Sequence, residues 1–267
     1  MTPVHYWLAF RAIVWREIAK FLRQTDRLLS ALVRPALWLL VFAAGLRDLL
    51  GVSIVPPYRT YVTYQEYILP GLIGITVLFQ CMQSALSMVH DREAGVMQAM
   101  LVTPLPRPFI LLAKITAATL LATLQVYAFL AVASLFGVVL PPWSWLTILP
   151  ALFAIGLMLG SIGLFVSTYT RRIENFAGMM NFVVFPMFFI SPALYPLWKL
   201  QESGAAQVYH LALVNPFTYA VELVRFAAYG QLQLEALAIV VVVAMASFAL
   251  AVHGYMPRAG TKSAAVT

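Results

Sequence analysis

Long apolar runs alternate with short polar connections along most of this 267-residue chain. A helix needs about 20 apolar residues to cross the hydrocarbon core of a bilayer. On this criterion the pattern predicts one domain over residues 1–267 with six transmembrane helices, at 28–46, 67–89, 109–139, 146–169, 176–190 and 234–252. The third run is longer than a bilayer requires, so that helix should tilt, bend or project. The predicted fold class is an all-α polytopic membrane protein.

Residues 1–27 differ from these runs because cations interrupt every apolar stretch. Arg11, Arg16 and Lys20 stand among tryptophan and aliphatic residues that recur at helical spacing. This pattern excludes a cleaved signal peptide. It predicts an interfacial amphipathic helix, with cations among the lipid headgroups and aromatic rings at the acyl boundary. The alternative is a solvated first helix of an adjoining bundle.

A short polar segment between the second and third predicted spans has a helical pattern of its own. Its charged start, Asp91 to Glu93, suits a helix N-terminus, where carboxylates face the positive end of the dipole. Apolar residues follow at helical spacing, and Thr103-Pro104 ends the pattern. The sequence predicts a short amphipathic helix over residues 91–104, lying at the membrane surface.

The composition excludes a soluble globular domain. Hydrophobic residues make up 62% of the chain and charged residues 10%, with a mean hydropathy of +0.87, whereas soluble domains are about 45–50% apolar and about 25% charged. With an even number of spans both termini lie on one side, and most of the 17 Lys and Arg residues fall there. The positive-inside rule makes that side the cytoplasm. We therefore expect an inner (plasma) membrane protein with both termini, and the 91–104 helix, in the cytoplasm.

Between residues 191 and 230 the chain is neither clearly spanning nor clearly soluble. Pro192, Pro196 and Pro216 interrupt it, and aromatic residues are interleaved with charged ones. We expect a broken, half-inserted external segment of short helices between the fifth and sixth spans. Irregular backbone at membrane depth is tolerated only where protein or water covers it.

Two glycines four residues apart, Gly156 and Gly160, lie in the fourth predicted span. Small residues at this spacing let two helices approach closely in a membrane. We therefore predict a helix-packing face at this place rather than a catalytic loop.

The sequence contains no pattern for covalent or metal chemistry. Its single cysteine, Cys81, excludes an intramolecular disulfide and any cysteine-built metal site. The four histidines have no metal-binding spacing, and His90 beside Asp91 is better explained as part of a solvated helix start. The glycine-lysine cradle of a P-loop is missing as well. We expect the chain to bind no cofactor or metal of its own and not to be an enzyme.

Two short motifs resemble those of the type-2 ABC exporter permeases, the ABC-2 family. The first is Glu93-x-Gly95, followed by Met100-Leu101-x-Thr103-Pro104 and Arg107. The second is Asn215-Pro216-Phe217-Thr218-Tyr219, followed by Glu222 and Arg225. The predicted order of elements also matches, so the resemblance covers essentially the whole chain. The common family pattern has more leucine where this chain has Met97 and Met100, which changes packing softness more than chemistry.

The resemblance implies that the 91–104 helix is a coupling helix seated in a cleft of a separate cytoplasmic P-loop ATPase. Two permease subunits, which we expect to be identical, would pair and receive two ATPase subunits that bind ATP and Mg. Glu93 and Arg107 would orient the docked helix, with an ordinary helix-start carboxylate as the alternative for Glu93. The coupling residues implied in this way are Asp91, Glu93, Gly95, Val96, Met97, Met100, Leu101, Thr103, Pro104 and Arg107.

The resemblance further implies an external gate formed by Asn215, Pro216, Glu222 and Arg225. Glu222 and Arg225 stand three residues apart on one helical face, so a simple mutual ion pair is the alternative for them.

Candidate residues for the translocation path come from the second and fifth predicted spans. We expect the following polar or aromatic residues to face inward: Phe79, Gln80, Gln83, Asn181, Phe182 and Phe185. Amide side chains inside a membrane must face protein or water. Hydrogen bonding between helices is the alternative role for these amides.

Together these expectations describe a homodimeric export permease driven by a separate ATPase. A pathway with aromatic residues and few charges favours an amphipathic or lipid-like substrate, such as a drug or a glycolipid. Membrane lipid is an expected partner and nucleic acid is not. The alternative function is a passive channel or secondary transporter, which should show intramembrane charges or an inverted repeat. An intramembrane enzyme would need a catalytic constellation.

Overall fold

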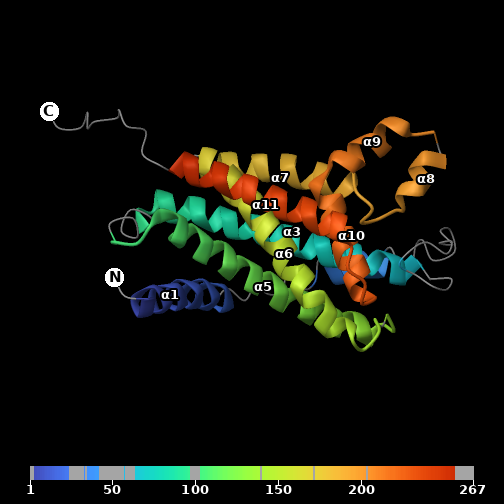
Figure 1. The fold of residues 1–267 in the computed structure, drawn as a ribbon, viewed down its shortest axis with the longest axis horizontal. Coiled ribbons are helices and arrows are strands. Elements are labelled where there is room, and N and C mark those ends of the chain that lie inside the picture. Colours follow the sequence, from blue (N-terminus) through green and yellow to red (C-terminus); the bar gives the residue numbers. More distant parts are fainter. Residues whose placement is uncertain are drawn as a thin grey trace.

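The computed structural model describes residues 3–23, 33, 35–41, 57, 64–96, 103–138, 140–170, 172–202 and 204–255. Within these ranges every regular element is a helix, so the predicted all-α class is confirmed. The long helices run side by side along the long axis of the molecule (Figure 1): α3 (Tyr64–Glu93), α5 (Arg107–Leu135), α6 (Ser144–Tyr169), α7 (Ile173–Phe189) and α11 (Leu234–Tyr255).

Four of the described helices are long and apolar enough to cross a membrane, namely α3, α5, α6 and α11. A further candidate is the pair α9 (Ala206–Val214) and α10 (Pro216–Ala228), which meet at a bend of 77°. α7 is apolar but only 17 residues long. Of the predicted first span, 28–46, the structure describes residues 33 and 35–41, which are helical. The rest of that span lies outside the described residues, so the count of six spans stays a prediction.

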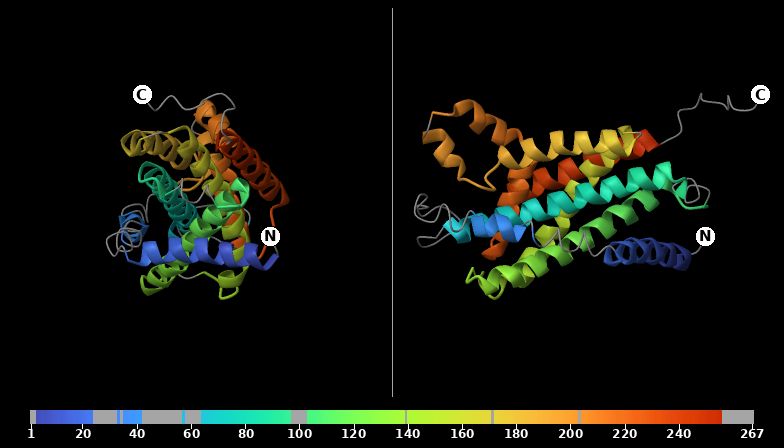
Figure 2. Two further views of the ribbon diagram at one scale, coloured as in Figure 1. Left: turned by 90° about the vertical axis from the view of Figure 1, so that its left-hand side faces the viewer. Right: turned by 180° about the vertical axis from the view of Figure 1, so that it is seen from behind.

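The described helices give the molecule two distinct ends (Figures 1 and 2). One end carries α1 (Pro3–Leu22), the last turns of α3, α6 and α11, and the first turns of α5 and α7; we call it the α1 end. The other carries α8 (Leu197–Glu202), α9 and α10; we call it the α8–α10 end. α1 packs against α5 and crosses the width of the bundle in the view along the long axis (Figure 2, left).

α6 lies at the centre of the bundle because it packs against α3, α5, α10 and α11. Gly156 and Gly160 face α5. A methyl group on Gly156 would lie 2.5 Å from a side-chain carbon of Thr119, and one on Gly160 would lie 2.8 Å from a side-chain carbon of Ile115. The helix-packing face predicted for this glycine pair is confirmed.

The structure contradicts the prediction that a new helix begins at Asp91. Residues 91–93 form the last turn of α3, and the chain leaves the helix at Gly95. Gly95 has a φ of +73°, the left-handed conformation that glycine readily adopts after a helix C-terminus. Acidic residues are stable at this helix end because neighbouring helices supply cations to Asp91, and these contacts outweigh the dipole preference.

α5 begins two residues before the predicted boundary. Its first residue is Arg107, and Pro108 is accommodated in the first turn, where proline has no helical hydrogen bond to lose. The preceding Thr103 and Pro104 are exposed and not helical. Met97, Met100 and Leu101 lie outside the described residues.

Residues 191–230 contain the short helices α8, α9 and α10, separated by turns. α10 packs against α3, α6, α7 and α11, so protein covers most of its backbone. Its position is consistent with the rule that interrupted helices at membrane depth need such cover. The insertion of this segment into an outer leaflet stays a prediction.

Residues 191–194 pack directly on α3. A methyl group on Gly71 would lie 2.0 Å from the carbonyl oxygen of Ala193. Nearby, the Tyr64 hydroxyl donates to the carbonyl oxygen of Leu194 at 2.7 Å. Gly71 therefore permits a close approach between two backbones that any larger residue prevents.

We expect Gly71→Ala to push this segment away from α3 and to lower the free energy of unfolding by about 1–3 kcal/mol, the range for overpacking. Thermal unfolding of the purified protein measures the effect. Gly178→Ala is the control, since a methyl group there meets no atom within 4 Å. Equal midpoints for the two variants would contradict the close approach at Gly71.

Candidate functional site

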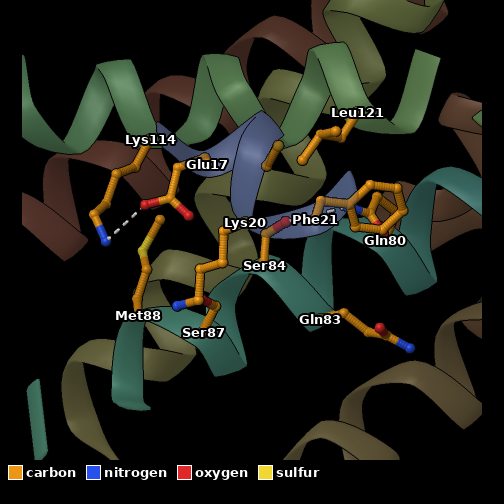
Figure 3. Close-up of a pocket in the computed structure, with 11 residues that line it drawn as sticks. Glu17, Lys20, Phe21, Gln80, Gln83, Ser84, Ser87, Met88, Lys114 and Leu121 are labelled. Carbon is orange, nitrogen blue, oxygen red and sulfur yellow. Dashed lines mark hydrogen bonds and ion pairs between the residues drawn. The ribbon is translucent and has the colours of Figure 1, made fainter. Parts of the chain in front are cut away.

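Five charged side chains from three helices meet at the α1 end, and we call them the ion network: Arg16, Glu17, Lys20, Asp91 and Lys114. Asp91 of α3 is the centre. Its Oδ2 accepts hydrogen bonds from Lys114 at 2.7 Å and from Arg16 at 3.1 Å, and its Oδ1 accepts one from Lys20 at 3.1 Å. Lys114 of α5 also lies 3.5 Å from Glu17. Figure 3 marks this ion pair with a dashed line.

Burial makes the ion network a strong constraint on the position of α1. The side chain of Lys114 is 1% exposed and that of Asp91 is 6% exposed. Charges removed from water to this degree are stable only when they are paired and hydrogen-bonded. The carboxylate of Asp91 therefore joins α1, α3 and α5 at one point.

A polar cavity of about 30 Å³ lies beside the ion network, between α1, α3 and α5 (Figure 3). Gln80, Gln83 and Ser87 of α3 line it, and its size suits a water molecule. Gln80 accepts a hydrogen bond from the amide of Gln125 on α5 at 2.9 Å. Gln80 therefore bonds two helices together, which is the alternative role that the sequence allowed for it.

Charged residues at both roots of the α3–α5 connection hold the ends of other helices. We call Arg92, Glu93 and Arg107 the terminus clamp. Arg92 donates to carbonyl oxygens in the last turn of α6 and just beyond it, and to the hydroxyl of Tyr255 on α11 at 3.0 Å. Arg107 donates to the carbonyl oxygen of Tyr255 at 3.0 Å. Glu93 accepts a hydrogen bond from the backbone N–H of Ile173, the first residue of α7, at 3.0 Å.

The signs of these contacts match the helix dipoles. Cations favour helix C-termini and carboxylates favour N-termini. Apart from the bond between Arg92 and the Tyr255 hydroxyl, these contacts are made to backbone groups at or next to a helix end. The residues on either side of the α3–α5 connection are thus bonded to α6, α7 and α11.

The structure divides the predicted coupling residues among different surroundings. Asp91 is buried in the ion network, whereas Glu93 and Arg107 belong to the terminus clamp. Gly95 ends α3, and Val96 is exposed at 38%. Sequence reasoning gave no role to Arg92 and treated Lys114 only as a cation near the start of a span. A cation inside a membrane span is stable only with a partner in the protein, so the position of Lys114 in the sequence already indicated a buried ion pair.

At the α8–α10 end, Asn215 joins two helices. Its Nδ2 donates to the carbonyl oxygens of Met187 and Ile190 at the end of α7, at 2.7 and 2.6 Å. Its Oδ1 accepts a hydrogen bond from the backbone N–H of Phe217 at 3.0 Å, which caps α10. Pro216 is the first residue of α10.

Arg225 ties α10 to the 191–194 segment and to α3. It is 3% exposed, pairs with Glu222, and donates to the carbonyl oxygen of Pro192 at 2.7 Å. Its guanidinium also lies over the ring of Tyr67, 4.2 Å from the centroid. The mutual ion pair of Glu222 and Arg225, the alternative to a gating role, is present. A gating role for these two residues stays a prediction.

We expect Asn215→Ala to lower the free energy of unfolding by about 1–2 kcal/mol, because an N-cap and the bonds to α7 are lost together. Asn215→Asp keeps the capping oxygen but removes the donor to α7, and it should also destabilise. If the aspartate variant unfolds at the wild-type temperature, the bonds to Met187 and Ile190 contribute nothing.

The chain does not bring the predicted path residues together in one site. Phe79 is half-buried, with its ring 6.5 Å from that of Phe188, and Gln80 is buried. Asn181, Phe182 and Phe185 lie on the outward face of α7, with Phe182 exposed at 79%. The Phe185 ring lies 5.7 Å from that of Phe188, so Phe188 is the contact between the two groups.

Comparisons with known proteins agree with the architecture. A sequence model of the family described as ABC-2 type transporter matches residues 8–229. The transport permease ycf38 of Cyanophora paradoxa is 29% identical over 222 residues, covering 80% of this chain and 72% of that protein. The inner membrane transport permease YadH of Escherichia coli K12 is 23% identical over 227 residues, 84% of each chain. Nodulation protein J of Rhizobium leguminosarum bv. viciae is 26% identical over 234 residues, 84% of this chain and 83% of that protein.

The family match begins within α1 and continues past the end of α10. It therefore includes the ion network, most of the terminus clamp contacts and the Asn215 junction, together with α3, α5 and α6, three of the helices that are apolar enough to cross a membrane. The chain is a helical transmembrane protein and belongs to the ABC-2 type transporter family of permeases.

Proposed function

We propose that this chain is the transmembrane subunit of an ATP-driven exporter of amphipathic or lipid-like molecules. A separate cytoplasmic subunit hydrolyses ATP, as is usual for partners of this family. The terminus clamp is the observation that supports this most directly. A force applied to the α3–α5 connection from the water acts through Arg92, Glu93 and Arg107 on the ends of α6, α7 and α11.

The proposed working cycle has two states. Closure of the ATPase pair moves the connection at residues 94–106, and the bonded ends of α6, α7 and α11 move with it. Packed helices shift between discrete arrangements rather than deforming continuously. The α1 end faces the cytoplasm in this proposal, because the cations of α1 and the exposed Arg172 lie there.

A second, identical permease subunit completes the path. The outward face of α7 exposes Phe182 at 79% and Phe185 at 45%, and Asn181 lies beside them. A partner covering this face would enclose a largely aromatic and uncharged route. Such a lining suits the apolar part of an amphipathic molecule.

Purification from the native membrane tests this proposal. A tagged wild-type protein should bring down a P-loop ATPase, and Val96→Glu in the α3–α5 connection should lose it. Leu232→Glu is the matched control, since Leu232 is an exposed apolar residue at the opposite end of the molecule. Absence of any ATPase in several mild detergents, together with substrate flux that needs no ATP in proteoliposomes, would instead support a passive channel or secondary transporter.

A further inference from the structure

α1 presents an apolar stripe away from the bundle. Its large apolar side chains Val4, Trp7, Leu8, Trp15 and Leu22 are exposed by 48 to 67%. The opposite side of α1 packs inward, where the rings of Tyr6 and Phe10 contact Phe109 at 5.3 and 6.4 Å. The exposed Arg11 shares this helix face. Several large apolar side chains exposed on one face, with a cation among them, mark a contact with a membrane or another molecule.

A wide groove of about 730 Å³ opens along one edge of this stripe. We call it the α1 groove; its lining residues are Ala12, Trp15, Arg16, Ala19, Lys20, Arg23 and Asp91. Residues 12, 16, 19 and 23 follow at steps of four, three and four, so they share one helix face. The lining combines the Trp15 ring and two small alanines with three cations.

The α1 groove carries an excess of positive charge. Arg16 pairs with Glu17 at 2.7 Å as well as with Asp91, and Asp91 also accepts hydrogen bonds from Lys20 and Lys114. Two carboxylates therefore stand against these three cations and Arg23. The side chains of Arg16 and Lys20 remain 38% and 34% exposed, and Arg23 is exposed. An anionic group in the groove would complement this charge at short range.

The depth of the α1 groove along α3 indicates which kind of anion would occupy it. α1 crosses the width of the bundle (Figure 2, left) at the level of Ser87 and Asp91, where the apolar face of α3 gives way to charged residues. For a helix α3 that spans the membrane this is the headgroup level. The occupant must therefore place an anionic group beside the cations and an apolar part along the tryptophan-rich stripe.

We propose that the α1 groove binds the phosphate of an anionic phospholipid, with the acyl chains lying along the stripe of Trp7, Leu8 and Trp15. This inference does not depend on the proposed ATP-driven cycle. A water-soluble ATPase subunit is the competing occupant of the groove, and the test below separates the two.

Native mass spectrometry of the full-length protein measures the lipid directly. The protein is purified in a mild detergent and offered equal amounts of phosphatidylglycerol and phosphatidylcholine with the same acyl chains. We expect wild type to retain phosphatidylglycerol preferentially. Arg23→Gln should weaken this preference by about fivefold, the effect of one basic residue near an anionic surface. Ala19→Trp should abolish it by filling the groove without changing its charge.

Lys199→Gln is the matched control, because Lys199 is an exposed cation beside Trp198 at the α8–α10 end. It should keep the wild-type preference. A preference that survives Ala19→Trp would show general surface attraction and would overturn the groove assignment. Displacement of the lipid by millimolar inorganic phosphate alone would identify a small-anion site and would also overturn it.

The competing occupant has its own signature. If Ala19→Trp keeps the phosphatidylglycerol preference but loses a co-purifying ATPase, the α1 groove is a protein-docking surface and the lipid proposal is wrong. Size-exclusion profiles matching wild type confirm that each variant is folded.

Discussion

Replacing Asp91 by asparagine is expected to lower the free energy of unfolding by about 3–5 kcal/mol, the range for removing one partner of a buried ion pair. The change leaves Arg16, Lys20 and Lys114 around a neutral amide. Glu17, 3.5 Å from Lys114, is then the remaining carboxylate of the ion network. Because the Lys114 side chain is 1% exposed, a single water molecule in the adjacent cavity offsets little of the lost charge. α1 should detach from α3 as the ion network fails.

Cys81 gives a direct readout of this loss. It is the only cysteine in the sequence and is 1% exposed, so a thiol-reactive dye reports its exposure as the protein is heated. Asp91→Asn combined with Lys114→Met should recover much of the stability, since replacing both charges of a buried pair is often neutral. Glu202→Gln makes the same chemical change at an exposed site and should alter stability by less than about 0.5 kcal/mol. Similar midpoints for Asp91→Asn and Glu202→Gln would mean that the ion network contributes nothing.

Replacing Arg92 by glutamine is expected to lower the number of molecules exported per ATP hydrolysed by about 5- to 150-fold, the range for a coupling free energy of 1–3 kcal/mol. Glutamine is shorter and cannot reach both the end of α6 and Tyr255, so α6 and α11 would no longer follow the α3–α5 connection. The ATPase should still co-purify, because the docking surface is unchanged. The measurement is the ratio of export to hydrolysis for the complex in proteoliposomes.

Amide hydrogen exchange tests the structural part of this prediction without a known substrate. Exchange should rise at the C-terminal ends of α6 and α11 in Arg92→Gln. Arg172→Gln is the control, since Arg172 is an exposed arginine at the same end of the molecule. If both variants exchange as wild type does, the bonds of Arg92 do not hold these helix ends.

Features that depend on local spacing were predictable from the sequence. The apolar runs anticipated α3, α5, α6 and α11, because each helix must be apolar over a bilayer's thickness to cross it. Gly156 and Gly160 were predictable as a packing face because they stand four positions apart, which places both on one side of a helix. Asn215 and Pro216 were predicted as part of an external gate, and that role stays a prediction; the bonds from Asn215 to α7 were not foreseen. Proline at the first position of α10 agrees with its fixed backbone angle.

Features that depend on distant partners were not predictable. Residues 91–93 were predicted to begin a helix but form the end of one. The cations that stabilise Asp91 at this helix end come from α1 and α5, which are remote in sequence. Arg92 was missed because its partners in α6 are backbone carbonyl groups, which any residue carries. The sequence allowed Gln80 either a place in the translocation path or a hydrogen bond between helices, because its partner Gln125 lies 45 residues away.

Elements at the two ends of the molecule are both bonded to α3, so the rise of α3 fixes the distance between them. α1 is bonded to α3 at Ser87, where Lys20 donates to the hydroxyl at 2.8 Å. The 191–194 segment is bonded at Tyr67, whose hydroxyl donates to the carbonyl oxygen of Pro192 at 3.4 Å. The 20 residues between these points rise about 30 Å, close to the hydrocarbon thickness of an ordinary bilayer. Because both attachments hold this length, a bilayer of another thickness is accommodated by tilting of the whole bundle or by local thickening or thinning of the lipid.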